Sequence, residues 1–277
     1  DSVALLRRLG FNRMSLGVQD FEPSVQQAVN RIQSEAQTLT VLEAARAQGF
    51  RSVSVDLMYG LPRQTVASFG RTLDRIVEFA PERLSVFNYA HLPERFKPQR
   101  RIDEAELPRP DVKLQILQET IDRLTQAGYV YIGMDHFARP DDELALAHRN
   151  RTLYRNFQGY STHADCDLIG IGMTSIGKVG NAYAQNERGI DDYYARIDAG
   201  HLAVFRGIAL SRDDEIRRDV ITRLICHFEL SFAEVEQVWG IAFRDYFAAD
   251  LHKLNAMAAD GLLELDAEAI RVLPRGR

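Results

Sequence analysis

The sequence predicts an α/β protein in which a parallel sheet or barrel is followed by a mostly helical C-terminal part. Short alternating strand patterns are separated by single helices, which implies right-handed βαβ crossovers. The same junction recurs three times, because a glycine ends a helix and an aromatic residue opens the next strand at 9–11, 48–50 and 127–129. From Asp213 onward the pattern is helical and finishes in a hairpin near 261–273, which is typical of a winged helix.

The N-terminal region is expected to hold three strand–helix units. We predict strands at 14–18, 52–57 and 84–89, and helices that begin at Ser2, Ser34 and Thr65. Ser34 and Gln37 have the spacing of a capping box. A charged, proline-rich stretch at 93–111 then interrupts the pattern, so the units are expected to form part of a barrel rather than a complete eight-unit one.

The rest of the chain is expected to form two further regions. A helix at 112–127 and a strand at 129–135 precede an irregular, glycine-rich and aromatic stretch at 149–181. The C-terminal helices are predicted at 215–227, at 231–238 with a Ser231/Glu234 capping box, and at 243–258. The predicted domains are therefore 1–110, 111–206 and 207–277.

Composition excludes several classes of protein. The chain of 277 residues has a net charge of −5, and the winged-helix-like region 207–277 has nine Lys and Arg against thirteen Asp and Glu, so we expect no nucleic-acid binding. No apolar run approaches the roughly 20 residues of a membrane span and no signal peptide is visible, so a cytoplasmic protein without membrane insertion is expected. The two cysteines, Cys166 and Cys226, have no metal-binding spacing and are expected to be buried thiols. The chain begins at Asp1 inside an expected helix, and we expect a fragment.

Polar side chains at the ends of the three strands indicate a ligand site. Asp56 lies near the carboxyl end of the central strand, Gln19 and Asp20 end the first, and Asn88 and Tyr89 end the third. Ligands bind at this edge of parallel α/β sheets. The alternative, a structural carboxylate that pairs with Arg51 or caps the loop, stays open for Asp56.

Three other patterns have weaker functional interpretations. Residues 172–178 match a phosphate-binding loop up to Lys178, but Val179 replaces the required hydroxyl, so a glycine-rich turn is favoured. His136 is either structural or a general acid–base. The stretch 149–160 interleaves arginines with aromatic residues, and this is either a solvated turn or a pocket for a planar ligand with several carboxylates.

Several segments together resemble one family. They are FNRMSLGVQDF (11–21), VNRIQ (29–33), SVDLMYGLPRQT (54–65), RLSVFNYAHLP (83–93), YIGMDHFARPDDELA (131–145) and RNFQGYST (155–162). The chain is similar along its whole length to oxygen-independent coproporphyrinogen III oxidase, the HemN type of radical S-adenosylmethionine enzyme. The resemblance implies the C-terminal half of a partial (β/α)6 barrel, followed by the α-rich, winged-helix-like domain of this family.

The resemblance also implies site residues, cofactors and a reaction. S-adenosylmethionine contacts carry over to Gln19, Arg31, Asp56, Ala90 and Ile176, and Gln158, Arg155 and Arg151 are the expected substrate side. A [4Fe–4S] cluster is implied, but its Cys-x3-Cys-x2-Cys loop is expected upstream of Asp1, and neither Cys166 nor Cys226 replaces it. No catalytic residue is therefore expected in this chain itself.

The implied activity belongs to the intact protein, and the chain alone is expected to be inactive. That activity is the oxidative decarboxylation of coproporphyrinogen III to protoporphyrinogen IX in haem biosynthesis, started by a 5′-deoxyadenosyl radical. An electron donor and an electron acceptor are expected as further partners, and a monomer is expected. Two alternatives are a haem-binding chaperone on the same scaffold and a P-loop nucleotide hydrolase that depends on Lys178.

Overall fold

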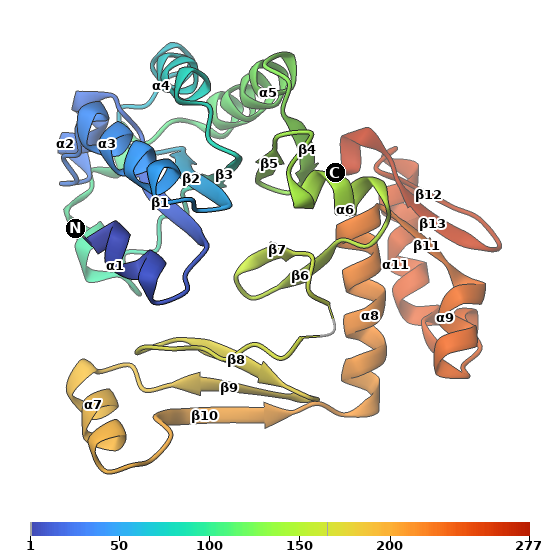
Figure 1. Cartoon of the computed structure of the whole chain (residues 1–277). Helices are drawn as coiled ribbons and strands as arrows, with labels where there is room; N and C mark the ends of the chain where they lie inside the picture. The colour runs from blue at the N-terminus through green and yellow to red at the C-terminus, as the bar shows by residue number, and fades with distance from the viewer. Residues whose placement is uncertain (1, 165) are drawn as a thin grey trace. The chain divides into compact units, whose positions relative to one another are not determined.

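The computed structural model describes residues 2–164 and 166–277, and the chain divides into two compact units, 1–146 and 147–277. Helices and strands follow one another along the chain as Figure 1 shows. No helix in the described part of the chain combines the length and the apolar character that a membrane crossing requires. The predicted division at 110 and 206 stays a prediction, although residues 110–138 pack in the first unit.

The first unit is built on one five-stranded sheet with the order β1-β2-β3-β5-β4. Its strands are β1 (Arg13–Gln19), β2 (Ser52–Tyr59), β3 (Arg83–Asn88), β4 (Val130–Gly133) and β5 (His136–Ala138). Its helices are α1 (Ser2–Arg8), α2 (Pro23–Ala28), α3 (Glu35–Ala47), α4 (Val66–Phe79), α5 (Pro110–Gln126) and α6 (Glu143–Arg149), the last of which continues past the unit boundary. Short 3-10 turns, η1 (Lys97–Arg101) and η2 (Glu104–Glu106), occupy the charged, proline-rich stretch at 93–111.

The three predicted strand–helix units are confirmed, and β1, β2 and β3 are parallel. The cap at Ser34 is a capping box with Gln37, and Thr65 caps α4 through Ser68. The single strand expected at 129–135 is wrong, because the chain turns back after Gly133 and forms β5, which is antiparallel to both β3 and β4. His136 is therefore the first residue of β5, which lies between β3 and β4 in the sheet. It does not come directly after a strand that ends at residue 135, as was expected.

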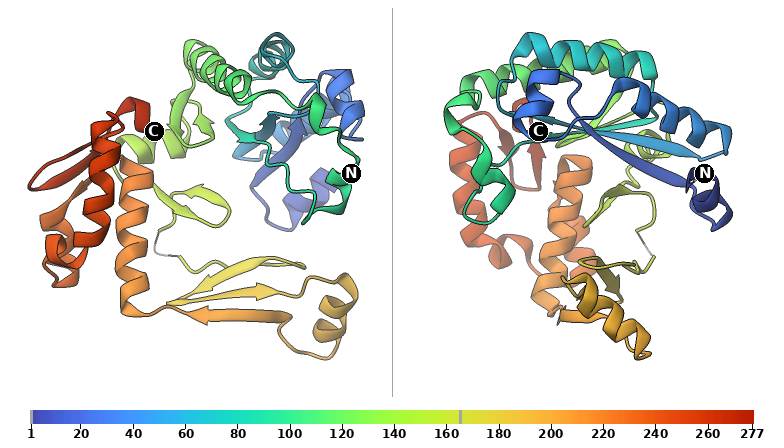
Figure 2. Two further views of the ribbon diagram at one scale, coloured as in Figure 1. Left: turned by 180° about the vertical axis from the view of Figure 1, so that it is seen from behind. Right: turned by 90° about the vertical axis from the view of Figure 1, so that its left-hand side faces the viewer.

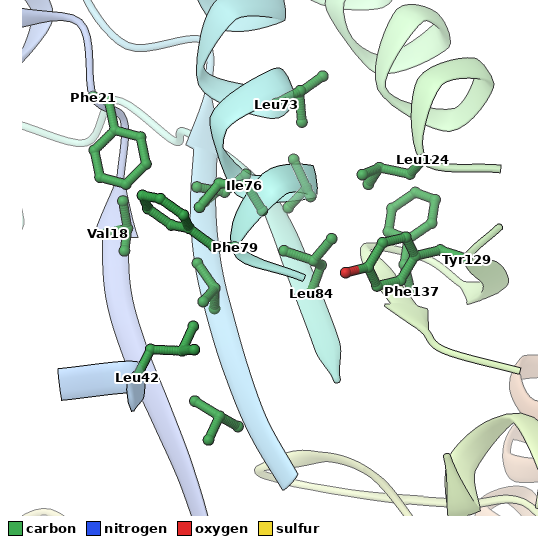
Figure 3. Packing of buried hydrophobic residues seen from close by; sticks show 14 of the residues in the cluster. Val18, Phe21, Leu42, Leu73, Ile76, Phe79, Leu84, Leu124, Tyr129 and Phe137 are labelled. Atoms are coloured by element: carbon green, nitrogen blue, oxygen red, sulfur yellow. The ribbon is translucent and has the colours of Figure 1, made fainter. Parts of the chain in front are cut away.

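The core of the first unit lies on one face of this sheet. Helices α3, α4 and α5 cover that face in both views of Figure 2, and Figure 3 shows the side chains between them and the strands. Val53, Val55 and Leu57 alternate from β2 into this core and are almost fully buried. Because successive strand residues point to opposite faces, Ser54, Asp56 and Met58 lie on the other face, which we call the open face.

The second unit combines two small antiparallel sheets, one hairpin and a helical C-terminal region. Its strands are β6 (Tyr154–Asn156), β7 (Gly159–Ser161), β8 (Ile176–Val179), β9 (Ala182–Asn186), β10 (Val204–Ala209), β11 (Glu229–Ser231), β12 (Leu263–Leu265) and β13 (Ala269–Val272). Its helices are α7 (Ile190–Asp198), α8 (Arg212–His227), α9 (Phe232–Trp239), α10 (Phe243–Tyr246) and α11 (Ala248–Ala259), with a final 3-10 turn η3 (Pro274–Gly276). The predicted C-terminal hairpin is confirmed as β12 and β13, and β11 joins it.

Four expectations for the second unit are wrong. The stretch 149–181, which was expected to be irregular, contains the strands β6, β7 and β8, because pairing between segments stabilises them. The Ser231/Glu234 capping box is absent, because Ser231 pairs with Ala269 in the small sheet and Glu234 accepts a hydrogen bond from Arg223. The helix expected at 243–258 is broken at Phe247, between α10 and α11. Cys166 is exposed, whereas Cys226 is buried as expected, and both are free thiols.

Candidate functional site

A row of paired residues crosses the open face of the first unit's sheet. Gly17 of β1 pairs with Asp56 of β2, Asp56 pairs with Ser85 of β3, and Ser85 pairs with His136 of β5. Phe87 contacts the imidazole of His136 edge-on, with ring centroids 6.0 Å apart. Paired residues share a face, so this row places several polar groups side by side.

Asp56 accepts a hydrogen bond from the neighbouring strand β1 and retains acceptor positions for a ligand. The Ser15 hydroxyl donates a 2.7 Å hydrogen bond to Asp56 Oδ2. Among the residues that the structure describes, we find no basic side chain paired with this carboxylate, and the predicted alternative of a pair with Arg51 is not formed. A half-buried carboxylate with one hydroxyl donor retains acceptor sites for hydroxyl or ammonium groups.

Gln19 and Arg31 meet above Gly17. The Arg31 guanidinium donates a 2.6 Å hydrogen bond from Nη2 to the Gly17 carbonyl oxygen. A β-carbon on Gly17 would lie 2.8 Å from Gln19 Nε2 and 3.1 Å from Arg31 Nη2. A glycine is therefore needed here so that both side chains can lie over the strand, beside Asp56, which pairs with Gly17.

The backbone at Gln19 is unusual. The pairing of β1 with β2 shifts between Gly17 and Gln19, and Gln19 has a φ of 68°, in the left-handed region. A bulge with a non-glycine residue at positive φ redirects the chain where β1 ends. Such conformations concentrate at functional sites, which agrees with a ligand-binding role for this strand end.

Buried polar groups support this edge from beneath. Asp20, which is 1% exposed, accepts hydrogen bonds from Thr72 Oγ1 at 2.5 Å, from Gln64 Nε2 at 2.6 Å and from the Glu22 backbone nitrogen at 2.9 Å. Burial raises the pKa of Asp20 above its ordinary value, although these donors oppose the shift. Gln64 also accepts a hydrogen bond from the Gly60 backbone nitrogen at 2.6 Å, so the network joins the end of β1 to the loop after β2. Asp20 is thus a structural residue.

Ala90 lies at the same edge as Gln19, just beyond β3. The backbone nitrogen of Tyr89 donates to the Tyr59 carbonyl oxygen at 2.8 Å and extends the pairing of β2 with β3 by one step. Gln99 holds the exposed Ala90 segment by donating to its carbonyl oxygen at 3.1 Å. The structure thus brings Gln19, Arg31 and Asp56 together around Gly17, with Ala90 at the end of β3 in the same unit.

The fifth expected cofactor residue, Ile176, belongs to the second unit and opens β8. Gly177 lies so close to the segment before β8 that a β-carbon there would be 2.8 Å from the Leu168 carbonyl oxygen. Lys178 is inside β8, whereas a phosphate-binding loop must lead into a helix. The P-loop alternative is therefore wrong, and the glycines serve close backbone approach.

The three expected substrate residues lie on and before the β6–β7 hairpin of the second unit. The Arg155 guanidinium stacks over the Tyr160 ring, 4.9 Å from its centroid, and Gln158 is exposed in the turn. Arg151 instead donates to Glu229 Oε2 at 2.8 Å, so its charge is already paired. Arg155 and Gln158 are consequently the better placed of the three.

Sequence reasoning missed Ser15 and Gly17. Neither carries a strong functional signal by itself, because serine and glycine are common in strands of every kind. The register of β1 against β2 decides their role, and that register comes from long-range pairing. The one available sign was that Gly17 lies two positions before Gln19, which follows the expected strand 14–18.

No metal centre is found in the described ranges 2–164 and 166–277. No three His, Cys, Asp or Glu side chains there lie close enough to bind an ion together. Cys166 and Cys226 are both free, and one is exposed while the other is buried. The described residues therefore do not fit an iron–sulfur cluster, which needs several thiolates at one place.

Comparison with known proteins gives consistent matches along the chain. Residues 1–76 match the model of the Radical SAM superfamily, and residues 210–277 match the model of the HemN C-terminal domain. Oxygen-independent coproporphyrinogen III oxidase of Pseudomonas aeruginosa is 55% identical over 276 residues, which is 100% of this chain and 60% of the relative. The protein of the same name from Thermostichus vulcanus is 48% identical over 98% of this chain and 84% of the relative.

A solved structure matches as well. The structure described as "Coproporphyrinogen III oxidase (HemN) from Escherichia coli is a Radical SAM enzyme" superposes with a TM-score of 0.95 at 55% identity, over 100% of this chain and 64% of that one. The mixed α/β architecture with a helical C-terminal domain is thereby confirmed. The chain spans about 60% of the length of the first curated relatives it matches, those of Pseudomonas aeruginosa, Escherichia coli and Synechocystis among them.

Proposed function

Because the chain belongs to the oxygen-independent coproporphyrinogen III oxidase family, we propose that the whole protein oxidatively decarboxylates coproporphyrinogen III to protoporphyrinogen IX. The reaction converts two propionate side chains to vinyl groups in haem biosynthesis without oxygen. We place the enzyme in the cytoplasm as a monomer that works with an electron donor and an electron acceptor.

The observation that supports this proposal most directly is the cluster around Gly17. S-adenosylmethionine carries a carboxylate, an ammonium group and ribose hydroxyls. The Arg31 guanidinium suits the carboxylate, while Asp56 and Gln19 suit the ammonium group and the hydroxyls. Ala90 offers backbone and packing, while Ile176 belongs to the second unit and stays an expectation from the family resemblance. When bound, S-adenosylmethionine supplies the radical chemistry that removes hydrogen from the substrate.

The [4Fe–4S] cluster of the proposed enzyme is assigned to a part of the whole protein outside this chain. The described residues offer no set of thiolates for it. This assignment agrees with the 60% of the Pseudomonas aeruginosa relative that the chain covers. What this chain contributes to the reaction is therefore binding and orientation of the cofactor and of the substrate.

The substrate side is assigned to Arg155 and Gln158, with Arg151 as a third, weaker candidate. Coproporphyrinogen III carries propionate carboxylates around a ring system, and arginine recognises carboxylates through paired donors. Arg155 lies over an aromatic ring, and the described residues offer it no carboxylate partner in ion-pair range. This combination suits a planar ligand with a charged edge.

The test uses the whole protein, reconstituted without oxygen, and follows both S-adenosylmethionine binding and the conversion of coproporphyrinogen III. Asp56→Asn is expected to weaken S-adenosylmethionine binding about tenfold and to lower turnover, because the carboxylate charge is lost. Ser54→Ala, on the same face and strand, is the control and is expected to behave as wild type. Haem binding by an intact protein that does not convert coproporphyrinogen III would contradict the proposal and favour a haem chaperone.

A further inference from the structure

The second unit contains a cavity of about 460 Å³ that the cofactor site does not use. Residues of β6, β8, β9 and α8 line it, and all of them belong to the second unit. The side chains that matter here are Arg155, Lys178 and Arg218, with the rings of Tyr154, Phe157 and Tyr183. We call it the β6–α8 cavity.

The charge of the β6–α8 cavity is positive, and two of the four cations that line it have no ion-pair partner among the described residues. Arg217 is engaged by Asp213 and Asp250, and the one acidic side chain of the lining, Asp214, caps α8 at Ser211. Arg218 lies 4.0 Å from Glu215 and donates a hydrogen bond to the Tyr183 hydroxyl at 3.5 Å. In the described part of the chain no carboxylate lies within ion-pair distance of Arg155 or Lys178, so these two cations are available to a ligand.

Arg155 also has an unmet hydrogen-bond donor. Its Nη1 atom is buried and finds no acceptor among the described residues, while its guanidinium lies over Tyr160. Buried donors are almost always paired, so an unmet donor on an arginine that lines the cavity favours a ligand that brings an acceptor. A carboxylate provides two such acceptors in the plane of the guanidinium.

Flat aromatic side chains complete the walls. Phe157 contacts Tyr183 edge-on, with centroids 4.9 Å apart, and Lys178 Nζ lies 5.9 Å from the centroid of Tyr154. Apolar rings beside free cations suit a ligand whose carboxylates are attached to a flat apolar framework. A cavity in the range of roughly 300–1,000 Å³ holds one drug-sized ligand. At about 460 Å³ it accommodates one edge of a tetrapyrrole and not the whole ring with its substituents.

We propose that the β6–α8 cavity binds the propionate carboxylates that the reaction leaves intact, with Lys178 and Arg155 as the residues that recognise them. The inference rests on the proposed function and names a subsite of the same substrate. A carboxylate held by two cations is stabilised in its ground state, which opposes its loss as carbon dioxide. The cavity therefore suits the retained propionates, and their binding orients the opposite edge of the ring for reaction.

The experiment measures binding of coproporphyrin III, the stable oxidised macrocycle, to the whole protein by fluorescence. Its tetramethyl ester is the uncharged comparison ligand. Lys178→Met and Arg155→Met are each expected to weaken coproporphyrin III binding about tenfold or more, and to leave the weaker binding of the ester unchanged. Lys253→Met is the matched control, because Lys253 is exposed, pairs with Asp250 and lies outside the β6–α8 cavity. It is expected to bind as wild type.

The outcomes separate this inference from the proposed function. Unchanged coproporphyrin III affinity in Lys178→Met and Arg155→Met, or equal affinity of the wild type for acid and ester, overturns the carboxylate subsite even if turnover is normal. A reconstituted wild type that binds the acid through these residues but does not convert coproporphyrinogen III supports the subsite and overturns the proposed function. If Arg155→Met does not fold, Arg155→Lys replaces it. This variant is expected to retain part of the affinity for coproporphyrin III, because the positive charge remains while the paired donors of the guanidinium are lost.

Discussion

Gln64 Nε2 donates a 2.6 Å hydrogen bond to Oδ2 of Asp20, and through it the loop after β2 is tied to the end of β1. The two residues are 44 positions apart in the chain, and both are buried. Gln64 uses its carbonyl oxygen to hold the Gly60 nitrogen at the same time. A buried network that adjoins Gln19 in the chain therefore supports the position of the residues around Gly17.

Asp20→Ala is expected to destabilise the first unit by about 3 kcal/mol. The substitution leaves the buried donors of Thr72, Gln64 and the Glu22 backbone without their acceptor, and each unsatisfied buried group costs about 1–3 kcal/mol, partly relieved by relaxation. Denaturant unfolding measures the change. Asp103→Ala, which removes an exposed cap on η2, is the control and is expected to change the free energy of unfolding little.

The carboxyl group of Asp20 also predicts how the stability of the protein depends on pH. Burial raises the folded-state pKa of Asp20, so the folded protein binds this proton more tightly than the unfolded chain. The contribution to stability is present below the ordinary pKa of about 3.9 and is lost as the pH rises through the folded-state value. The stability of wild type relative to Asp20→Asn should therefore decrease from pH 4 toward neutral pH. An increase over that interval would contradict our account of the network.

Gly17→Ala is expected to separate ligand binding from folding. Gly17 does not have a positive φ, so alanine fits its backbone, and the atoms that its β-carbon would meet are the ends of the Gln19 and Arg31 side chains. These ends must move, and we expect about tenfold weaker S-adenosylmethionine binding in the whole protein, measured by calorimetry. The free energy of unfolding should change by less than about 1 kcal/mol. Full affinity in this variant would mean that Gln19 and Arg31 do not bind the cofactor from these positions.

Arg83→Met is expected to destabilise the first unit strongly, by about 3–5 kcal/mol, because it leaves Asp142 unpaired. Arg83 Nε donates to both Asp142 carboxylate oxygens at 3.0 Å, and Arg83 Nη2 donates to Glu143 at 2.8 Å. The side chains of Arg83 and Asp142 are only 14% and 6% exposed. Thermal or denaturant unfolding measures the loss. Arg139→Met, which removes a more exposed ion pair with Asp141, should remain near wild type. Equal effects of the two substitutions would show that burial does not decide the contribution.

Acid is expected to destabilise the second unit through two half-buried histidines. Burial lowers the pKa of both His148 and His227. Nearby positive charge lowers it further, from Arg277 at His148 and from Arg151 at His227. The unfolded chain thus binds these protons more readily, so the stability contribution is present above pH ~6.5 and is lost as the pH falls through the folded-state values. We expect the free energy of unfolding to fall between pH 7 and 5.

Substitution distinguishes these two histidines from the rest. His148→Gln and His227→Gln should each make the pH dependence of unfolding shallower, while His252→Gln, an exposed histidine of α11, should leave the slope as in wild type. A wild-type slope in both of the first two variants would assign the acid sensitivity to other groups. Far-UV circular dichroism during denaturant titration at each pH provides the measurement.

Local signals in the sequence were enough for the three strand–helix units of the first unit and for the C-terminal hairpin. The capping residues Ser34 and Thr65 and the helix-ending glycines predicted helix boundaries that the structure confirms, since capping depends on neighbouring residues only. The C-terminal hairpin was also visible from its apolar runs. The strand β5 was not, because its three residues are stabilised by pairing with Arg83–Ser85, which lies about fifty positions earlier.

By itself, the sequence determined the α/β class, the three parallel strands, the residues expected to bind S-adenosylmethionine and the family to which the chain belongs. Those conclusions depend on local periodicity, caps and motif text, all of which are written along the chain. Only the tertiary structure decided that Gln19 and Arg31 meet over Gly17 beside Asp56, and that the buried Asp20 has a structural role. It also decided that Arg151 is paired with Glu229 and that Lys178 lies in a strand at a cavity wall. Strand register and packing between distant segments set these relationships, and a one-residue change of register would turn every side chain of a strand to the opposite face.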